Sequence, residues 1–326
     1  MEIGSGASHP ASRAWRCAAF FLLGLVVLDQ AGGAVLDVLF ARSRSGETAG
    51  AVNEALAHDA EIFVFGSSRA VHHVDTDVLA GEFGCSAFNA GANGQSAWYA
   101  VALEHLLLGR GRRPRLFLLQ VEPKDLYFPR LDRIKVLAPY WGENAFVDEL
   151  LTRTDRFARL KLSSRLYRYN SRALAVVRAG LSGAAPAGSG FEPLVGRLDP
   201  AKWPQRAPRE LLGVEEAPPP EGAEPYRAFA KAARSESIPV VWFTGPRWRG
   251  GEPKLASERM GEAVLREVAA ETGGRFLDLD ERALPEFEDV RWYRDPGHLN
   301  AQGARAFTRV LVRKLRELRF QCVRPG

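Results

Sequence analysis

Short apolar runs alternate with helical stretches along most of the chain, and this alternation limits the fold more than any other feature. The candidate strands are residues 61–66, 86–89, 115–121, 238–244 and 275–279. Helical patterns cover 96–109, 223–235, 255–272 and 301–319, the last with Asn300 as its N-cap. Strands separated by helices are typical of βαβ units. We therefore predict an α/β fold, a flavodoxin-like three-layer sandwich with a five-stranded parallel sheet.

The alternation breaks at residues 126–222, which we interpret as an insertion with some helix and a long irregular tail. An insertion after the third strand emerges at the carboxyl end of the sheet, where open α/β sheets bind ligands, so we expect it to set substrate specificity. Its aromatic side chains can stack on sugar rings, although packing is the simpler role for them. They are Tyr127, Tyr140, Trp141, Tyr167, Tyr169 and Trp203.

The tetrapeptide Asp295-Pro296-Gly297-His298 places an acid three residues before an imidazole. Proline second and glycine third are what a type II β-turn demands, so we expect the outer Cα atoms within about 7 Å. A carboxylate beside an imidazole selects the tautomer whose other nitrogen is free as a base, and it stabilises the imidazolium that forms. Taken alone, a helix-capping turn with an incidental histidine is the simpler interpretation.

A candidate nucleophile lies far upstream, where the first predicted strand runs into Gly66-Ser67-Ser68-Arg69. A sharp turn at the carboxyl end of a central strand lifts a serine into the ligand crevice and directs backbone N–H groups toward it. We choose Ser68 as the nucleophile, although serines that only cap the next helix explain the same residues. With Asp295 and His298 it completes the three roles of a catalytic triad.

A glycine-rich loop, residues 88–96, follows the second predicted strand and contains Asn93 and Gly94. Glycine lets backbone N–H groups approach a ligand closely. An oxyanion hole needs such donors, aimed at the oxygen of the tetrahedral intermediate.

The order and content of these blocks resemble the SGNH (GDSL-like) hydrolase superfamily over about residues 60–320, and most closely its membrane-anchored branch. That branch includes proteins of alginate O-acetylation and teichoic acid D-alanylation. The resemblance implies the SGNH hydrolase fold, with Ser68 as nucleophile, Gly94 as an oxyanion donor, and Asp295 and His298 as the DxxH block, which is the most specific of the matches.

Two positions depart from the family pattern. Ser67 replaces the usual aspartate before the nucleophile, which the membrane-anchored branch tolerates. The third block, normally GxND, reads Val121-Glu122-Pro123-Lys124-Asp125, so the asparagine that gives the third oxyanion donor is missing. Lys124 or Asn93 are candidate substitutes.

Residues 17–28 are uninterrupted apolar sequence behind Arg13 and Arg16, and the chain stays mostly apolar as far as Ala41. A cleaved signal peptide, a single spanning helix and a core helix each fit this stretch. Arginines flank it on both sides, so charge does not decide its orientation. The resemblance favours a transmembrane signal-anchor.

We therefore expect an N-terminal tail over 1–16, the anchor over 17–41, a linker over 42–60 and one SGNH hydrolase-like domain over 61–326. The resemblance places the catalytic domain outside the cytoplasm, in the periplasm or at the cell surface. Cys85 and Cys322 are either free or one disulfide pair. The net charge of +5 comes from scattered arginines, which argues against nucleic acid as a partner.

The predicted function is acyl transfer through an acyl-Ser68 intermediate, as an esterase or an O-acyltransferase. By analogy with the family, the substrate is an ester, with acetyl groups on a cell-surface glycan in the lead, and a membrane-bound acyltransferase is a candidate partner. The alternative is a non-catalytic surface protein that binds glycan or assists polysaccharide assembly. No cofactor or metal site is predicted, since His72 and His73 lack further ligands at zinc-like spacing and fit surface or packing roles.

Overall fold

The computed structural model describes residues 10–44, 49–182, 188–203 and 207–322. Its centre is one sheet of five parallel strands in the order β2-β1-β3-β4-β5, which confirms the predicted α/β fold. Each strand lies within its predicted range: β1 Ile62–Phe65, β2 Ala87–Asn89, β3 Leu116–Gln120, β4 Val240–Phe243 and β5 Arg275–Leu277.

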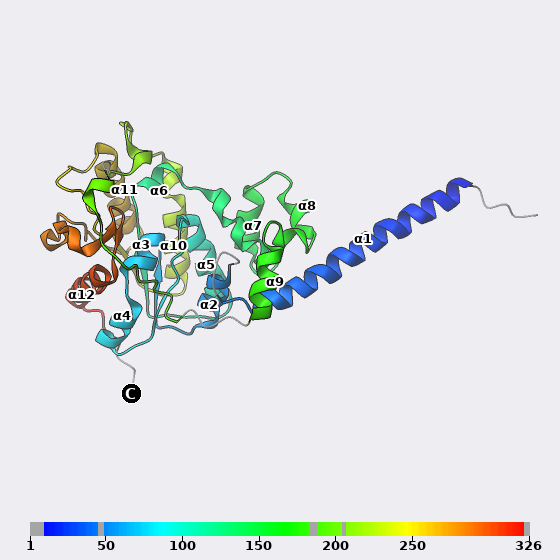
Figure 1. Cartoon of the computed structure of the whole chain (residues 1–326), viewed down its shortest axis with the longest axis horizontal. Helices are drawn as coiled ribbons and strands as arrows, with labels where there is room; N and C mark the ends of the chain where they lie inside the picture. Colours follow the sequence, from blue (N-terminus) through cyan, green and yellow to red (C-terminus); the bar gives the residue numbers. More distant parts are fainter. Residues whose placement is uncertain (1–9, 45–48, 183–187, 204–206, 323–326) are drawn as a thin grey trace, which may run out of the picture.

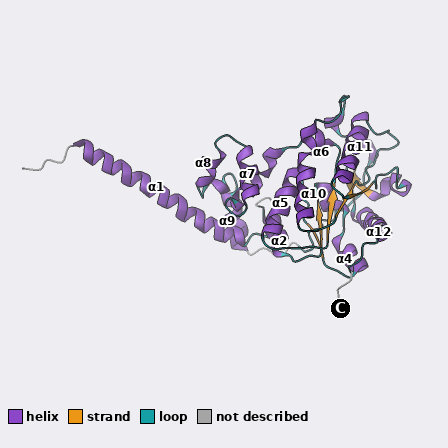
Figure 2. Ribbon diagram, turned by 180° about the vertical axis from the view of Figure 1, so that it is seen from behind, coloured by secondary structure: helices purple, strands orange, loops and turns teal. Residues whose placement is uncertain are grey.

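Both faces of the sheet are covered by helices, as Figures 1 and 2 show. Ile62 and Val64 of β1 pack on the side of α3, α4 and α12, whereas Phe63 and Phe65 pack on the side of α2, α5 and α10. This two-sided burial explains why the central strands are continuous apolar runs. The covering helices are α2 Gly50–Ala57, α3 Ser68–His73, α4 Thr76–Phe83, α5 Ala97–Gly109, α10 Glu224–Ser235, α11 Ala256–Glu271 and α12 Ala301–Glu317.

The amino-terminal boundaries differ from those predicted. Helix α1 covers Pro10–Ala41, so it begins inside the expected tail. Part of the expected linker is helix α2, whose Val52, Ala55 and Leu56 are buried in the same core as α5. Three apolar residues on one face of a short helix bury against the sheet layer, and the body therefore begins before residue 61.

Helix α1 projects away from the body (Figure 1). Its stretch from Arg13 to Ala41 is long and apolar enough to cross a membrane. Large side chains from Phe20 to Leu28 are exposed, while Leu36 and Phe40 near its end are buried. The buried end packs against α9, which covers Ala173–Ser182.

The insertion after β3 is mainly short helices. Its middle, α7 to α9, packs against α5 and α1. Arg133 of η1 contacts the loop after β2, and the later part of the insertion reaches the turn after β1. Tyr140 and Tyr169 are almost fully buried, which gives them the packing role. The elements are α6 Lys124–Tyr127, α7 Ala145–Arg153, α8 Ala158–Ser163, α9, and the 3-10 helices η1 Leu131–Tyr140, η2 Tyr167–Tyr169, η3 Pro200–Lys202, η4 Arg209–Leu211 and η5 Pro220–Ala223.

The chain after β5 forms two 3-10 turns, a hairpin and α12. Asn300 caps α12 as predicted, because its side-chain oxygen accepts a hydrogen bond from the Gly303 N–H at 3.0 Å. Beyond α12, Cys322 forms a disulfide with Cys85. The turns are η6 Pro285–Glu288 and η7 Val290–Trp292, and the antiparallel hairpin is β6 Tyr293–Asp295 with β7 His298–Leu299.

Candidate active site

The turn after β1 exposes Ser68 at the start of α3. Gly66 has a φ of +147°, and a Cβ there would lie 2.8 Å from the Gln120 side chain and 2.9 Å from that of Ala70. Only glycine fits such a turn. Ser67 then caps α3, and Ser68 is the first helical residue, so its N–H has no partner within the helix.

The Ser67 side chain points inward and stabilises this turn through hydrogen bonds. Its one hydroxyl proton is shared between side-chain oxygens of Glu122 and Gln120, and its oxygen accepts a hydrogen bond from the Arg69 N–H. Glu122 also pairs with Arg69 at 3.9 Å and with Lys124 at 3.3 Å. Burial alone would raise the pKa of Glu122, but the two cations and the Ser67 hydroxyl hold the pKa of this carboxyl below its usual range.

Asp295 organises the second half of the site. Its Oδ1 accepts hydrogen bonds from the Gly297 N–H at 2.8 Å and the His298 N–H at 3.1 Å. The prediction of a type II turn is wrong, because Gly297 is absent from the described glycines with positive φ. The aspartate side chain holds the turn in its place, as Asp does in Asx-turns.

The imidazole of His298 lies against the same carboxylate, with Nδ1 at 3.0 Å from both oxygens. Burial would raise the pKa of Asp295, but hydrogen bonding to His298, its charge and the two backbone N–H groups outweigh burial, so this pKa lies below its usual value. A carboxylate at Nδ1 assigns the proton to that nitrogen and leaves Nε2 as an acceptor.

Ser68 and His298 meet across the fold. The Ser68 Oγ lies 2.8 Å from the His298 Nε2, although 230 residues separate them. The structure thus brings Ser68, His298 and Asp295 into one chain of hydrogen bonds. A short distance with this tautomer lets the hydroxyl donate to Nε2, which is the geometry of a nucleophile beside its general base.

The adjacent histidines are buried packing residues and do not lie at the surface. His73 is fully buried, and its Nε2 accepts a hydrogen bond from the Leu299 N–H at 3.1 Å, which ties α3 to β7. Burial and then the charge of Arg69 hold the pKa of His73 well below its usual value. His72 Nδ1 lies 2.7 Å from the Glu192 carbonyl oxygen, and burial lowers its pKa too.

A cavity of about 370 Å³ opens over Ser68 and His298. Of the six aromatic residues that are candidates for stacking on sugar rings, Trp203 lines this cavity. Lys124, from the third block, also lines the cavity, as expected. The sequence analysis did not identify the charged residues around Ser68, although Arg69 and Glu122 lie within four residues of the ends of β1 and β3. The lining residues are Ser68, Arg69, Glu122, Lys124, Trp203, Ala207, Pro208, Arg209, Glu210, Arg247, Asp295, Pro296, Gly297 and His298.

Arg69 and Arg247 are two further cations of this lining, Arg69 buried and Arg247 half-buried. Burial, and next the neighbouring charge of Arg69, lower the pKa of Arg247 to about 10. The cavity therefore has buried positive charge beside the serine, and Glu122 balances part of it.

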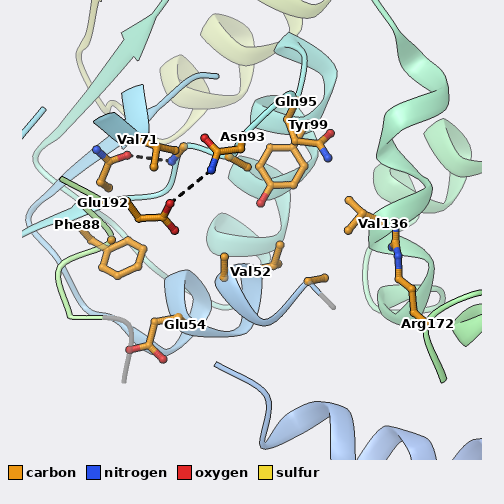
Figure 3. Close-up of a pocket in the computed structure, with 16 residues that line it drawn as sticks. Val52, Glu54, Val71, Phe88, Asn93, Gln95, Tyr99, Val136, Arg172 and Glu192 are labelled. Atoms are coloured by element: carbon orange, nitrogen blue, oxygen red, sulfur yellow. Dashed lines mark hydrogen bonds between the residues drawn. The ribbon is translucent and has the colours of Figure 1, made fainter. Parts of the chain in front are cut away.

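The two predicted oxyanion residues do not line this cavity. Asn93 lies in a separate pocket, where its amide donates to Glu192 at 3.4 Å (Figure 3). The Gly94 carbonyl accepts a hydrogen bond from Arg133. Gly94 has a φ of +68°, a backbone conformation that favours glycine, so local conformation accounts for this residue.

One acidic group among the described residues has the spacing of a metal site. Ligand atoms of Glu262, Asp278 and Asp280 lie within 4.8 Å of one another. Lys254 already pairs with Glu262 at 2.5 Å and with Asp280. The lysine ammonium therefore supplies the positive charge of this group.

Comparison with known proteins yields little. No protein family and no curated protein matches the chain. Among solved structures, the acetyl xylan esterase AlAXEase is similar with a TM-score of 0.41 and 10% sequence identity, over 79% of this chain and 100% of that one. A likeness at this TM-score carries no argument about function.

Proposed function

We propose that the chain is a serine acyl hydrolase or O-acyltransferase of the SGNH type, with Ser68, His298 and Asp295 as its catalytic residues. The observation that supports this most is the hydrogen-bonded chain from the Ser68 hydroxyl through both ring nitrogens of His298 to the Asp295 carboxylate. A merely capping serine would have no reason to meet an oriented imidazole at the mouth of a cavity.

In the first half-reaction, the Ser68 Oγ attacks the carbonyl carbon of an ester while the His298 Nε2 takes the hydroxyl proton. Asp295 stabilises the imidazolium that forms. When the tetrahedral intermediate collapses, the ester oxygen leaves with the proton from His298, and the acyl group stays on Ser68. Water, or a sugar hydroxyl, then attacks the acyl-serine with His298 again as base.

The oxyanion donors that this cavity offers differ from the family pattern. The Ser68 N–H at the start of α3 is one donor. Lys124 lines the cavity and is our candidate for the second, as a cation in place of the missing asparagine. Gly94 and Asn93 have this role only if their loop reaches the cavity when substrate binds.

The proposed substrate class is an acylated glycan at the cell surface, with an acetyl group as the acyl and a membrane-bound acyltransferase as a candidate partner. Trp203 supports a sugar ligand, because it is an exposed aromatic at the cavity. We place the domain outside the cytoplasm, anchored by α1. The Cys85–Cys322 disulfide supports this location, because disulfides persist in oxidising compartments.

Hydrolysis of p-nitrophenyl acetate by the purified full chain tests the enzyme proposal. We expect turnover that Ser68→Ala and His298→Ala each reduce by about 10⁴-fold or more. Ser67→Ala is the comparison variant, because it removes the neighbouring hydroxyl, which holds the turn but has no part in the proposed reaction, so its loss of rate should be far smaller than that of Ser68→Ala. Equal background rates in all four proteins would favour the non-catalytic glycan-binding alternative.

A fluorophosphonate probe identifies the nucleophile independently of substrate. We expect the full chain to be labelled, and Ser68→Ala to abolish the label while Ser67→Ala retains it. Labelling that survives Ser68→Ala would show that the nucleophile is a different serine.

A further inference from the structure

We propose that residues 156–166, which contain α8 and the turn after it, form a surface that lies on the lipid bilayer next to α1. This basic apolar surface would fix the orientation of the body above the membrane. The proposal rests on α1 as the membrane anchor and is independent of the catalytic chemistry.

The turn after α8 is bound to α1 between Asp29 and Asp37, with most of its hydrogen bonds at Asp29. The Asp29 carboxylate accepts hydrogen bonds from the Ser164 hydroxyl at 2.5 Å and from the N–H groups of Arg165 at 3.0 Å and Leu166 at 3.2 Å. Arg165 also pairs with Asp37 at 2.6 Å. These contacts hold the turn at the depth of Asp29 along α1.

Close packing strengthens this junction. A Cβ on Gly33 of α1 would lie 2.1 Å from that of Arg165, so glycine is required for the approach. The Tyr169 hydroxyl donates to Asp37 at 2.6 Å. In both ribbon views, α7, α8 and α9 lie between the sheet and α1 (Figures 1 and 2). The turn and α1 therefore form one structural unit.

The length of α1 before this junction fits a bilayer. The exposed part of α1 before Asp29 runs from Arg13 to Leu28 and spans about 24 Å at about 1.5 Å per residue. Arg13 and Arg16 lie at its start, where long basic side chains can extend to the opposite headgroups. The hydrocarbon core is about 30 Å thick. If this part of the helix crosses the membrane, the outer boundary of the bilayer falls at Asp29, the level at which the turn after α8 is bound.

The side chains at this level have the character of an interfacial helix. Phe157 is 49% exposed, Leu160 is 74% exposed and Leu166 is 41% exposed. The exposed arginines Arg156 and Arg159 lie beside them. Apolar side chains flanked by basic ones favour the boundary between acyl chains and anionic headgroups.

The charge of the chain is concentrated in this region. Residues 153–178 contain eight basic side chains and one acidic one, a net charge of +7, whereas the whole chain has +5. The remainder is therefore at −2. The basic residues are Arg153, Arg156, Arg159, Lys161, Arg165, Arg168, Arg172 and Arg178. An anionic lipid surface is the partner that this distribution fits.

Fluorescence quenching in lipid nanodiscs tests the surface on the full chain. A polarity-sensitive dye is attached through Leu160→Cys in a Cys17→Ser background and quenched by spin-labelled lipids. In a second sample the same dye is attached to native Cys17, a free cysteine on α1, so that its quenching measures whether α1 is in the bilayer. Val195→Cys in the same background is the matched control, because Val195 is 82% exposed and its neighbour Leu194 is bonded to Ala301 at the start of α12.

We expect quenching at positions 17 and 160 and none at 195. If the dye at position 17 is quenched but the dye at position 160 is not, α1 is an anchor and the proposed lipid-binding surface is wrong. If the dye at position 17 is not quenched, both the anchor and the surface are wrong. A blue shift at 160 without lipid quenching would mean that protein covers the surface, which also overturns the proposal. Arg156→Glu with Arg159→Glu should weaken quenching at 160 in discs that contain phosphatidylglycerol, and an unchanged signal would contradict the role of anionic lipid.

Discussion

Two aspartates each hold a turn of this chain through two backbone N–H groups and one side chain. One aspartate lies at the candidate active site, and the other lies on the helix that projects from the body. Asp295 accepts from two backbone N–H groups and the imidazole of its own hairpin. Asp29 accepts from two backbone N–H groups and a hydroxyl that lie 135 to 137 residues away. The same chemistry thus builds a local device in one region and joins distant segments in the other.

The two regions should respond differently to loss of the carboxylate. At the candidate active site, the Asp295 carboxylate holds a turn of four residues and also sets the tautomer of His298. The charge of this carboxylate should therefore matter more than its shape. At the α1 junction no proton moves, so only attachment is at stake.

The largest effect is expected from Asp295→Asn. The amide oxygen can still accept from the Gly297 and His298 N–H groups, so the turn should persist. Its NH₂ group favours the tautomer with the proton on Nε2, which cannot accept from Ser68. We expect kcat for p-nitrophenyl acetate to fall by about 10⁴-fold with little change in Tm. A kcat within tenfold of the parent would show that Asp295 does not orient the base.

Glu122→Gln extends the comparison to a second carboxylate at the active site. The amide keeps the shape and can bond Ser67, but it leaves Arg69 and Lys124 without their buried counter-charge. We expect the free energy of unfolding to fall by about 3 kcal/mol, measured by urea titration. Glu143→Gln, which removes an exposed partner of Arg110, is the control and should cost less than about 1 kcal/mol.

His73→Gln tests how the buried imidazole of His73 makes the free energy of unfolding depend on pH. In the folded chain the pKa of His73 is depressed, so below about pH 6.5 the unfolded chain binds a proton that the folded chain does not. Its contribution to stability is therefore lost as pH falls. Glutamine can accept from the Leu299 N–H but does not titrate.

The parent should thus lose stability relative to His73→Gln by about 1.4 kcal/mol for each pH unit below about 6.5. Urea titrations of both proteins at several pH values measure this difference, in which the groups they share cancel. A difference that is constant with pH would mean that His73 is protonated in the folded chain.

The smallest effect on catalysis is expected from Asp29→Ala. This change removes the acceptor of the three hydrogen bonds from the turn after α8, so trypsin should cleave faster at Arg165 and Arg168. The kcat should stay within about twofold, because the site is built on the sheet and α12. Asp29→Asn, which keeps one acceptor oxygen, should be cleaved at an intermediate rate. A fall in kcat comparable to that of Asp295→Asn would show that the junction and the active site are one unit.

The same contrast explains how far the sequence predicts the structure. The five strands, the Asn300 cap and the pairing of Asp295 with His298 depend on local pattern or on spacing of a few residues, and each was predictable. The position of Ser68 was also predictable, because a strand that ends in glycine and serine places the serine at the carboxyl edge of a parallel sheet, where it meets His298.

Long-range contacts were not accessible in this way. The partners of Glu122 come from the end of β1, and those of Asp29 from the insertion, and no periodicity records such distances. The prediction for Gly94 did not hold for a related reason, since its positive φ favours glycine whether or not a ligand is present. Helix α2 was missed because eight residues give a weak helical pattern between two charged stretches.

The hairpin that carries Asp295 and His298 leads directly into α12, with only the cap residue Asn300 between them. The Leu299 N–H at the end of the hairpin donates to His73 of α3, the same short helix that begins with Ser68. Beyond α12, the Cys322–Cys85 disulfide joins the end of the described chain to the segment just before β2. The 2.8 Å distance between the Ser68 Oγ and the His298 Nε2 therefore depends on how α3 and α12 pack against each other.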